Sequence, residues 1–259
     1  MRNQPQHSRD NKRKSYDNIV FGRQPVIELL QAAKPIDKIL LQQGAHGEIV
    51  NDIRKLAKEK EVPVKTVPEE KLNTITGGNH QGVVAFTSAV DFQKIENILP
   101  LVIEKGETPL LLILDGITDV RNFGAIARTA YAAGVHALII PFTDTSPINS
   151  EAIKTSAGAL YKIPVCREKN LQAVIDYLEL NGLLLIGTDA NAEQKIYTLD
   201  LTPPLAFIIG SEDTGISYIL RKRLTHNASI PVIQEFDSYN VSVAAGMVLY
   251  ECMRQRSLL

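Results

Sequence analysis

The stretch LLLILDGITDVRNFGAIARTAYAAGVHALII, residues 110–140, contains a complete strand–helix–strand pattern. Residues 110–114 form an apolar run that predicts a buried strand, and residues 136–140 predict a second one. Residues 122–133 lie between them and predict a helix, followed by Gly134 where a helix C-cap belongs. Apolar strands that alternate with helices are typical of a mostly parallel sheet covered on both faces. The expected fold class is therefore α/β.

The same alternation continues to the end of the chain and defines a domain at residues 109–259. Further strands are expected at residues 163–165, 183–187, 205–209 and 228–232. Further helices are expected at residues 150–160, 171–180, 216–224 and 241–254. Ligands in such sheets bind beyond the carboxyl ends of the strands, so the loops that follow strands are the ones to inspect.

The sequence before residue 109 has a different organisation. Residues 18–88 predict a small α/β domain, with strands at 36–41, 62–67 and 82–87 and a helix at 48–60. Residues 89–108, in which Pro100 interrupts an amphipathic stretch, are expected to form a linker. Residues 1–17 predict a disordered basic tail, either a solvated leader or an arm that seeks phosphate groups.

Composition excludes several classes of protein. The 259 residues carry 28 Lys+Arg and 29 Asp+Glu, so a histone-like polycation is excluded. Residues 1–90 hold 14 basic and 10 acidic residues, whereas the rest of the chain holds 14 and 19. No strictly apolar run is longer than Leu110–Leu114, far below the ~20 residues of a membrane span. With no secretory signal either, we expect a cytoplasmic protein without membrane contact.

Motifs for metal, nucleotide and hydrolase chemistry are absent from the sequence. Two cysteines and five scattered histidines form no metal-binding pattern, so no metal is expected. The loop after residue 114 is not G-x-G-x-x-G, which disfavours dinucleotide binding. The loop 210–217, GSEDTGIS, has Ile216 where a phosphate-binding loop has Lys. No G-x-S-x-G elbow occurs.

Three polar loops remain after the expected strands. In the first, two roles are open for Asn122, as a helix cap or as a functional group, and Arg128 is either a paired surface residue or a site residue. The second carries Glu212 at a helix start, and the third carries Ser238 and Asn240 before a small-residue helix. Each loop is a weak signal alone, but three at the ends of one sheet form a stronger one.

In order and spacing, these loops resemble the three motifs of the SpoU (TrmH-type) RNA 2′-O-methyltransferases of the SPOUT class. The matching stretches are DVRNFGAIARTA (119–130), GSEDTG (210–215) and IPVIQEFDSYNVSVAAGMVLYE (230–251). GRQPVIELL (22–30) and NHQGVVA (79–85) are similar to the small, ribosomal-protein-like substrate-binding domain of bacterial 23S rRNA guanosine 2′-O-methyltransferases.

The resemblance implies a C-terminal SPOUT domain threaded as a deep trefoil knot, which general rules of topology make rare. It further implies S-adenosyl-L-methionine as cofactor, 23S ribosomal RNA as substrate and a homodimer formed through the knotted domain. The expected activity is transfer of a methyl group to a ribose 2′-oxygen, with guanosine as the expected nucleoside.

Family roles carry over to matching positions in this chain. The expected catalytic residues are Asn122, Arg128, Glu212, Ser238 and Asn240. The expected cofactor contacts are Thr188, Gly210, Ile230 and Tyr239. The expected RNA contacts are Arg23, His80 and Gln81. As an alternative, Arg23 and His80 are ordinary surface or turn residues.

Two positions depart from the family pattern. Asp213 stands where the second motif usually has Gly, and Tyr239 stands where the third usually has Leu. Neither change removes a polar catalytic position. Two other functions also remain as alternatives, namely 2′-O-methylation of tRNA and a non-catalytic RNA-binding role in ribosome assembly.

Overall fold

The computed structural model describes residues 18–32, 34–234 and 238–257. The chain divides after Thr87 into two compact units. The expected basic tail, residues 1–17, lies outside the described residues. Each unit has its own sheet and its own core.

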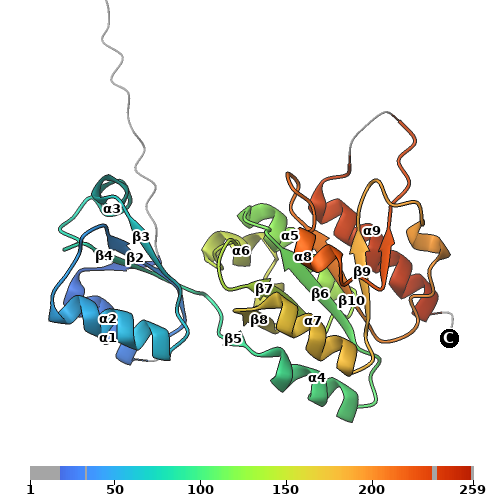
Figure 1. Ribbon diagram of the computed structural model, residues 1–259, viewed down its shortest axis with the longest axis horizontal. Helices are drawn as coiled ribbons and strands as arrows, with labels where there is room; N and C mark the ends of the chain where they lie inside the picture. Colours follow the sequence, from blue (N-terminus) through green and yellow to red (C-terminus); the bar gives the residue numbers. More distant parts are fainter. Residues whose placement is uncertain (1–17, 33, 235–237, 258–259) are drawn as a thin grey trace, which may run out of the picture. The chain divides into compact units, whose positions relative to one another are not determined.

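The first unit is a four-stranded mixed sheet covered by helices on both faces (Figure 1). Its strands, in sheet order, are β1 (Ile19–Phe21), β4 (Val83–Thr87), β2 (Ile36–Gln42) and β3 (Val64–Val67). Only the β2–β3 pair is parallel. Its helices are α1 (Arg23–Gln31), α2 (Glu48–Glu59) and α3 (Glu69–Thr76). Helices α1 and α2 share one core with the sheet, and α3 covers the opposite face.

The second unit contains a seven-stranded sheet in which every pair is parallel. In sheet order the strands are β11 (His226–Ala228), β9 (Leu184–Thr188), β10 (Leu205–Gly210), β6 (Leu110–Asp115), β7 (Ala137–Pro141), β8 (Val165–Glu168) and β5 (Phe92–Gln93). The strands β6 and β10 are central neighbours, and their last residues, Asp115 and Gly210, are register partners. Their loops therefore leave the sheet side by side.

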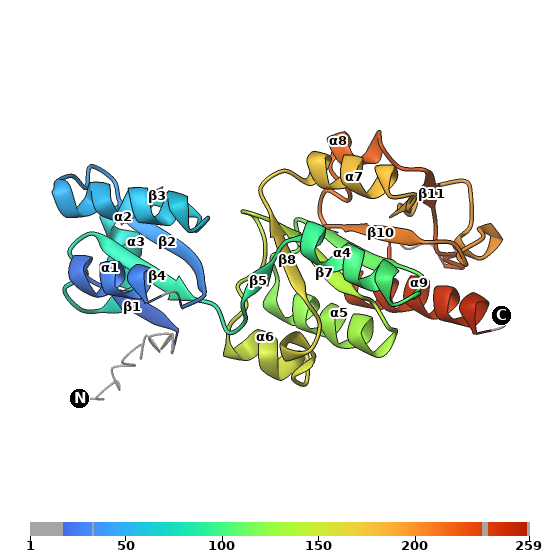
Figure 2. The same cartoon turned by 90° about the horizontal axis from the view of Figure 1, so that it is seen from below.

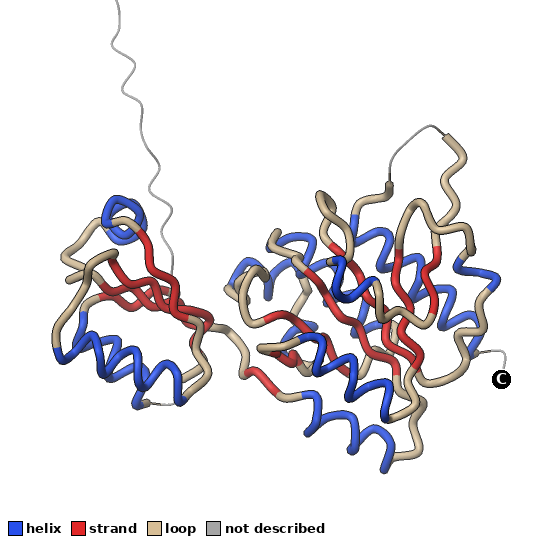
Figure 3. Tube along the Cα trace, viewed as in Figure 1, coloured by secondary structure: helices blue, strands red, loops and turns tan. Residues whose placement is uncertain are grey.

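Helices cover both faces of this sheet, as Figures 2 and 3 show. One face packs against α5 (Val120–Ala132), α6 (Ser150–Thr155) and α9 (Val241–Arg256). The other packs against α4 (Ile95–Glu104), α7 (Leu171–Leu180) and α8 (Tyr218–Arg221). Two short 3-10 turns, η1 (Ala159–Tyr161) and η2 (Ile196–Thr198), complete the described elements. The α/β class expected from the sequence is confirmed.

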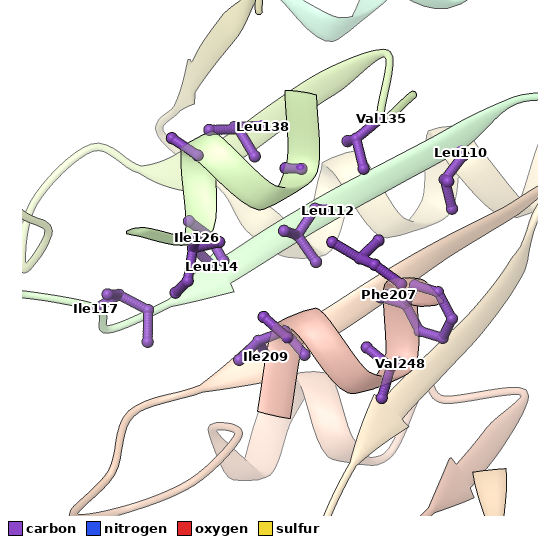
Figure 4. Close-up of a cluster of buried hydrophobic side chains, with 14 of the residues drawn as sticks. Leu110, Leu112, Leu114, Ile117, Ile126, Val135, Leu138, Phe207, Ile209 and Val248 are labelled. Carbon is purple, nitrogen blue, oxygen red and sulfur yellow. The ribbon is translucent and has the colours of Figure 1, made fainter. Parts of the chain in front are cut away.

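The alternation of side chains along β6 divides the core into two layers. Leu110, Leu112 and Leu114 face α5 and α9, where Phe207 and Val248 join them (Figure 4). Leu111 and Ile113 point to the opposite layer. This packing fixes the first turns of α5 and α9 beside the ends of β6 and β10.

The C-terminal end of α9 is held by its last side chains. The Arg256 guanidinium donates hydrogen bonds to the carbonyl oxygens of Leu201, Thr108, Pro109 and Pro203, at 2.7 to 3.2 Å. Gln255 adds a bond from its amide to the Leu199 carbonyl and accepts one from the Leu201 amide. Anchored at this end and packed along its length, α9 presents its N-terminus at a fixed place.

The segment 89–108, expected to be a linker, belongs instead to the second unit. Phe92 and Gln93 pair with β8 as the edge strand β5. Helix α4 runs through Pro100 without a break and buries Ile95 and Leu99 against the sheet. A strand of two residues is too short to show alternating polar and apolar side chains. Pro100 argued against a helix that packing against the sheet stabilises.

Other element boundaries also differ from expectation. The last strand, β11, ends at Ala228, and Ile230 and Val232 beyond it line a cavity. The expected helix at 150–160 stops at Thr155, where Ala157 and Gly158 adopt positive φ. Strand β8 lies later and α8 is shorter than expected. The trefoil knot stays a prediction, because strand order and pairing do not specify threading.

Candidate active site

Three polar side chains from three different elements meet at the carboxyl edge of the second sheet. The Asn122 amide donates to Glu212 Oε1 at 3.1 Å, and the Asn240 amide donates to the same oxygen at 2.7 Å. The Asn240 amide also lies 3.1 Å from Asn122 Oδ1. The Val241 N–H reaches Glu212 Oε1 at 3.3 Å. Residues up to 118 positions apart thus form one closed network around a single carboxylate oxygen.

Helix capping sets the positions of the two asparagines. Asp119 is the N-cap of α5, and its carboxylate accepts from the backbone of Arg121 and Asn122. Asn122 therefore does not cap the helix, and its side chain is left to bind Glu212. Asn240 does cap α9, through Oδ1, and still donates to Glu212 through its nitrogen.

A tight turn after β10 holds Glu212 in place. A Cβ added at Gly210 would lie 2.0 Å from the backbone carbon of Gly215, so only glycine fits here. The turn closes with a hydrogen bond from the Gly215 N–H to the Ser211 carbonyl at 2.9 Å. Asp213, the departure from the family pattern, is exposed and is not among the residues with positive φ, so aspartate fits without strain.

Asp115, which the sequence left unassigned, ties this turn to the neighbouring strand. Its Oδ2 accepts from the Ser217 N–H at 2.7 Å. The only signal in the sequence is a carboxylate at the end of a central strand. Asp115 therefore ties the end of β6 to the backbone just after the second motif, and among the described residues it takes no part in the Asn122–Glu212–Asn240 network.

A cavity of about 280 Å³ lies beside the Asn122–Glu212–Asn240 network. All four expected cofactor contacts line it, together with Glu212 and Ser238. The hydroxyl of Tyr239 donates to the Pro231 carbonyl at 3.0 Å, which ties the two flanks of the third loop together. The structure therefore gathers residues from positions 188, 210, 230 and 239 around one cavity.

Two charged residues that the sequence did not single out also line this cavity. Asp189 follows β9, Arg221 ends α8, and their side chains form an ion pair at 3.5 Å. The other carboxylate oxygen of Asp189 accepts from the Asn191 N–H. Neither residue lies in a family motif, so only the three-dimensional structure reveals them.

Arg128 lies apart from the network. It is six residues after Asn122 on α5, about 9 Å further along the helix axis. Its side chain is exposed and makes no hydrogen bond or ion pair within the described residues. Arg121 on the same helix is instead paired with Glu151 at 3.3 Å. The guanidinium of Arg128 is thus available to a ligand from outside the chain.

In the first unit the three expected RNA contacts meet around one turn. Arg23 Nε donates to the Gln81 carbonyl, and the Arg23 N–H donates to Gln81 Oε1, both at 3.1 Å. His80 is 5% exposed, accepts from the Gly82 N–H at Nδ1 and lies 2.9 Å from Asn73 Oδ1 through Nε2. Since both ring nitrogens are occupied, His80 fixes the turn.

Three further observations on the described ranges concern metal ligands, thiols and apolar helices. Within them no group of three or more His, Cys, Asp or Glu side chains is placed to hold a metal ion. Both cysteines are buried, and burial raises the pKa of the Cys166 thiol to about 12, so it stays protonated at neutral pH. None of the helices described is both long and apolar enough to cross a membrane.

Comparison with known proteins finds similar methyltransferases that cover nearly the whole chain. A Staphylococcus aureus (strain MSSA476) protein named "Putative TrmH family tRNA/rRNA methyltransferase" is 37% identical over 240 residues, 93% of this chain and 97% of that protein. The structure of an AdoMet-bound rRNA methyltransferase from Sinorhizobium meliloti matches with a TM-score of 0.59 and 26% identity, covering 93% of this chain and 88% of that one.

A further structure and two family models complete the comparison. The SpoU methyltransferase AviRb from Streptomyces viridochromogenes shares the fold, with a TM-score of 0.60, 24% identity and coverage of 93% and 91%. A model described as RNA 2′-O ribose methyltransferase substrate binding matches residues 19–93. The model of the SpoU rRNA Methylase family matches residues 109–250, which include the whole network and the cavity beside it. By this match the chain belongs to the SpoU rRNA methylase family, the RNA 2′-O-methyltransferases of the TrmH type.

Proposed function

We propose that this protein methylates the 2′-oxygen of a guanosine ribose in 23S ribosomal RNA. S-adenosyl-L-methionine is the methyl donor. The observation that carries the proposal is the closed Asn122–Glu212–Asn240 network beside a ligand-sized cavity. The substrate-binding unit that precedes the catalytic unit favours ribosomal RNA over a smaller substrate. Because the proposed substrate is ribosomal RNA, we also propose that the enzyme works in the cytoplasm.

The residues around the cavity fit the cofactor chemically. Ile209, Ile230 and Val241 provide apolar walls for an adenosine group. The carboxylates of Asp189 and Glu212 complement the positive sulfonium and ammonium groups, and Arg221 complements the carboxylate of the methionine part. The backbone at Gly210 can approach a ligand closely. When bound, the cofactor supplies a methyl group on positively charged sulfur.

Arg128 is proposed to stabilise the RNA oxygen that receives the methyl group. A ribose hydroxyl is a weak nucleophile until its negative charge is stabilised. Arginine keeps its proton near pH 7, so Arg128 acts by binding a phosphate and the developing alkoxide rather than as a base. Its exposed and unpaired guanidinium, within the described residues, suits that task.

Glu212 is proposed to position the two asparagines. One of its oxygens already accepts three hydrogen bonds, from the side chains of Asn122 and Asn240 and from the Val241 backbone. No contact joins it to Arg128 within the described residues, so Glu212 does not orient the arginine within one chain. With Ser238 at the cavity wall, the asparagines supply neutral groups that hold the ribose in line for displacement.

A homodimer is proposed to form through α9. Val243, Met247, Tyr250 and Met253 follow one another at helical spacing and are 37–64% exposed. Tyr131 on the adjoining helix α5 is also exposed. A continuous apolar stripe on a surface helix marks an interface, and a second copy of the chain meets it with the same stripe.

Charge on this stripe should separate the subunits. We expect Tyr250→Glu to shift the protein from twice the 28.6 kDa chain mass to the chain mass in analytical ultracentrifugation, because a carboxylate would be desolvated in the interface. Tyr161→Glu changes an equally exposed tyrosine on η1, outside the stripe, and should leave the dimer intact. Loss of the dimer in both variants, or in neither, would contradict an α9 interface.

The substrate is tested by methyl transfer to defined RNA. Labelled S-adenosyl-L-methionine is incubated with the full chain and RNA from a strain lacking the gene, and 23S RNA, 16S RNA and tRNA are separated. We expect label in 23S RNA, recovered as 2′-O-methylguanosine after digestion. Label in tRNA would replace this proposal with tRNA methylation. No label in any RNA, with cofactor binding intact by calorimetry, would instead favour a non-catalytic role in ribosome assembly.

A further inference from the structure

A polar basin in the first unit contains more than the expected RNA contacts. It has a volume of about 580 Å³ and lies between the start of α1, the end of β2, the start of α3 and the turn 78–82. Arg23, Gln42, Glu69, Asn73, Asn79 and Gln81 all line it. A role for this basin depends on the proposed function in one respect, namely that RNA is the ligand of this unit.

The basin is preorganised by hydrogen bonds beneath it. The buried His80 ring joins Asn73 of α3 to the Gly82 backbone, at 2.9 Å on each side. Arg23 Nε is held by the Gln81 carbonyl, which fixes the direction of the guanidinium. Gln81 and Gly82 both adopt positive φ, so the turn follows a backbone path that few sequences support. The lining groups are therefore placed before any ligand arrives.

Two charged groups in the basin have unused hydrogen-bonding capacity. Glu69 accepts from the Gln42 amide through Oε2 at 3.1 Å, while its Oε1 has no bond within the described residues. The two terminal guanidinium nitrogens of Arg23 also have no hydrogen bond to any described residue. The basin thus offers one free carboxylate oxygen and one free guanidinium edge, surrounded by neutral amides.

This combination suits a nucleobase better than a phosphate. A phosphate would gain from Arg23 but would be repelled by the carboxylate of Glu69. Single-stranded RNA bases are bound through their Watson–Crick and Hoogsteen edges when they are unstacked. A site with a carboxylate, a guanidinium and amides presents the acceptors and donors that such edges require.

Among the four bases, guanine matches both charged groups at once. Its Hoogsteen edge carries two acceptors, N7 and O6, which arginine binds with two donors. Its Watson–Crick edge carries the N1–H and N2–H₂ donors, which a carboxylate accepts. Adenine and cytosine each offer the carboxylate only an exocyclic amine, and uracil flanks its single N–H with two carbonyl oxygens that a carboxylate repels. We propose that this basin binds an unpaired guanine of the RNA and that Glu69 selects it.

The test compares guanine with inosine, which lacks only the N2 amine. Fluorescence anisotropy measures binding of the full chain to a hairpin RNA whose uridine loop carries one guanosine, and to the same hairpin with inosine there. A hydrogen bond to a charged group is worth about 1.5–3 kcal/mol, so we expect guanosine to bind roughly 10- to 100-fold more tightly. Glu69→Gln should reduce this ratio to less than about threefold.

The neighbouring carboxylate provides the matched control. Glu70 lies on the same helix and is exposed, but it does not line the basin. Glu70→Gln should retain the preference for guanosine and report any general gain in RNA affinity from removing a negative charge. Equal binding of the guanosine and inosine hairpins by the wild type, or an unchanged ratio in Glu69→Gln, would overturn the proposal.

This measurement is independent of methyl transfer. A guanosine preference that disappears in Glu69→Gln supports the basin even where the catalytic assay finds label in tRNA. Conversely, methylation of 23S RNA without a guanosine preference in the hairpin supports the proposed function, and the proposal that the basin binds guanine is then wrong. Circular dichroism of the folded Glu69→Gln variant, which keeps a side chain of the same shape, separates lost selectivity from lost structure.

Discussion

Arg128→Ala is expected to lower the rate of RNA methylation by about 10²- to 10³-fold while leaving cofactor affinity unchanged. Removing a group that stabilises a developing oxyanion typically costs a factor of this size. Arg128 does not line the cavity at positions 188–244, so its loss should not alter binding of S-adenosyl-L-methionine. The rate is measured with labelled cofactor at saturating RNA, and the affinity by calorimetry.

Arg121→Ala is the matched control for this variant. Arg121 lies on the same helix, is also exposed and carries the same charge, but it is paired with Glu151. We expect its replacement to change the rate less than about threefold, because an exposed ion pair contributes about 0–1 kcal/mol. A similar fall in both variants would indicate a general loss of positive charge for RNA binding, and Arg128 would then have no role at the reacting oxygen.

The central elements of the second unit could be predicted because their signals are local and strong. The strands at 110–114 and 205–209 are apolar runs bounded by Pro and Gly or Asp, and each matches its observed strand to within one residue. The helix at 171–180 is reproduced as expected, with Asn170 as its side-chain cap. Burial on both faces of a parallel sheet gives such strands a composition that no loop shares.

Elements defined by distant partners could not be predicted. The edge strand β5 is two residues long, and its partner β8 lies more than 70 positions away. The ring of Phe92 is covered by the Arg167 guanidinium, at 3.8 Å from the ring centroid. Residues 89–108 therefore join the second unit through contacts with residues distant in the sequence, and the segment itself has no pattern that predicts those contacts.

The candidate site also contains residues that the sequence could predict and residues that it could not. Motif order placed Asn122, Glu212 and Asn240 together, and the carboxyl ends of parallel strands explain why they meet. Which side chain caps α5 depends on where the helix begins, and a shift of three residues from Asn122 to Asp119 changed the role of Asn122. The Asp189–Arg221 pair joins two loops outside the motifs, so sequence spacing carries no signal for it.

The turn at Gly210 leads to the second large expected effect. Gly210→Ala should weaken binding of S-adenosyl-L-methionine at least about 100-fold and lower the melting temperature. The added Cβ would lie 2.0 Å from Gly215 C and 2.1 Å from Ile216 N, both backbone atoms. Overpacking against atoms that cannot rotate away costs about 1–3 kcal/mol or more. The turn must therefore open. Opening would break the hydrogen bond from the Gly215 N–H to the Ser211 carbonyl and would move Glu212.

Gly246→Ala separates this steric cause from any general intolerance of glycine replacement. Among the described residues of one chain, a Cβ at Gly246 would meet only Thr129 Cγ2, at an ordinary 3.7 Å, and the position is inside helix α9. Alanine is favoured there by about 1 kcal/mol, so the melting temperature should stay equal or rise slightly and the cofactor affinity should not change. The two variants add the same methyl group, and calorimetry with thermal unfolding measures both effects. Unchanged cofactor affinity in Gly210→Ala would show that the turn yields without moving Glu212, and the close backbone contact would then have no part in forming the cavity.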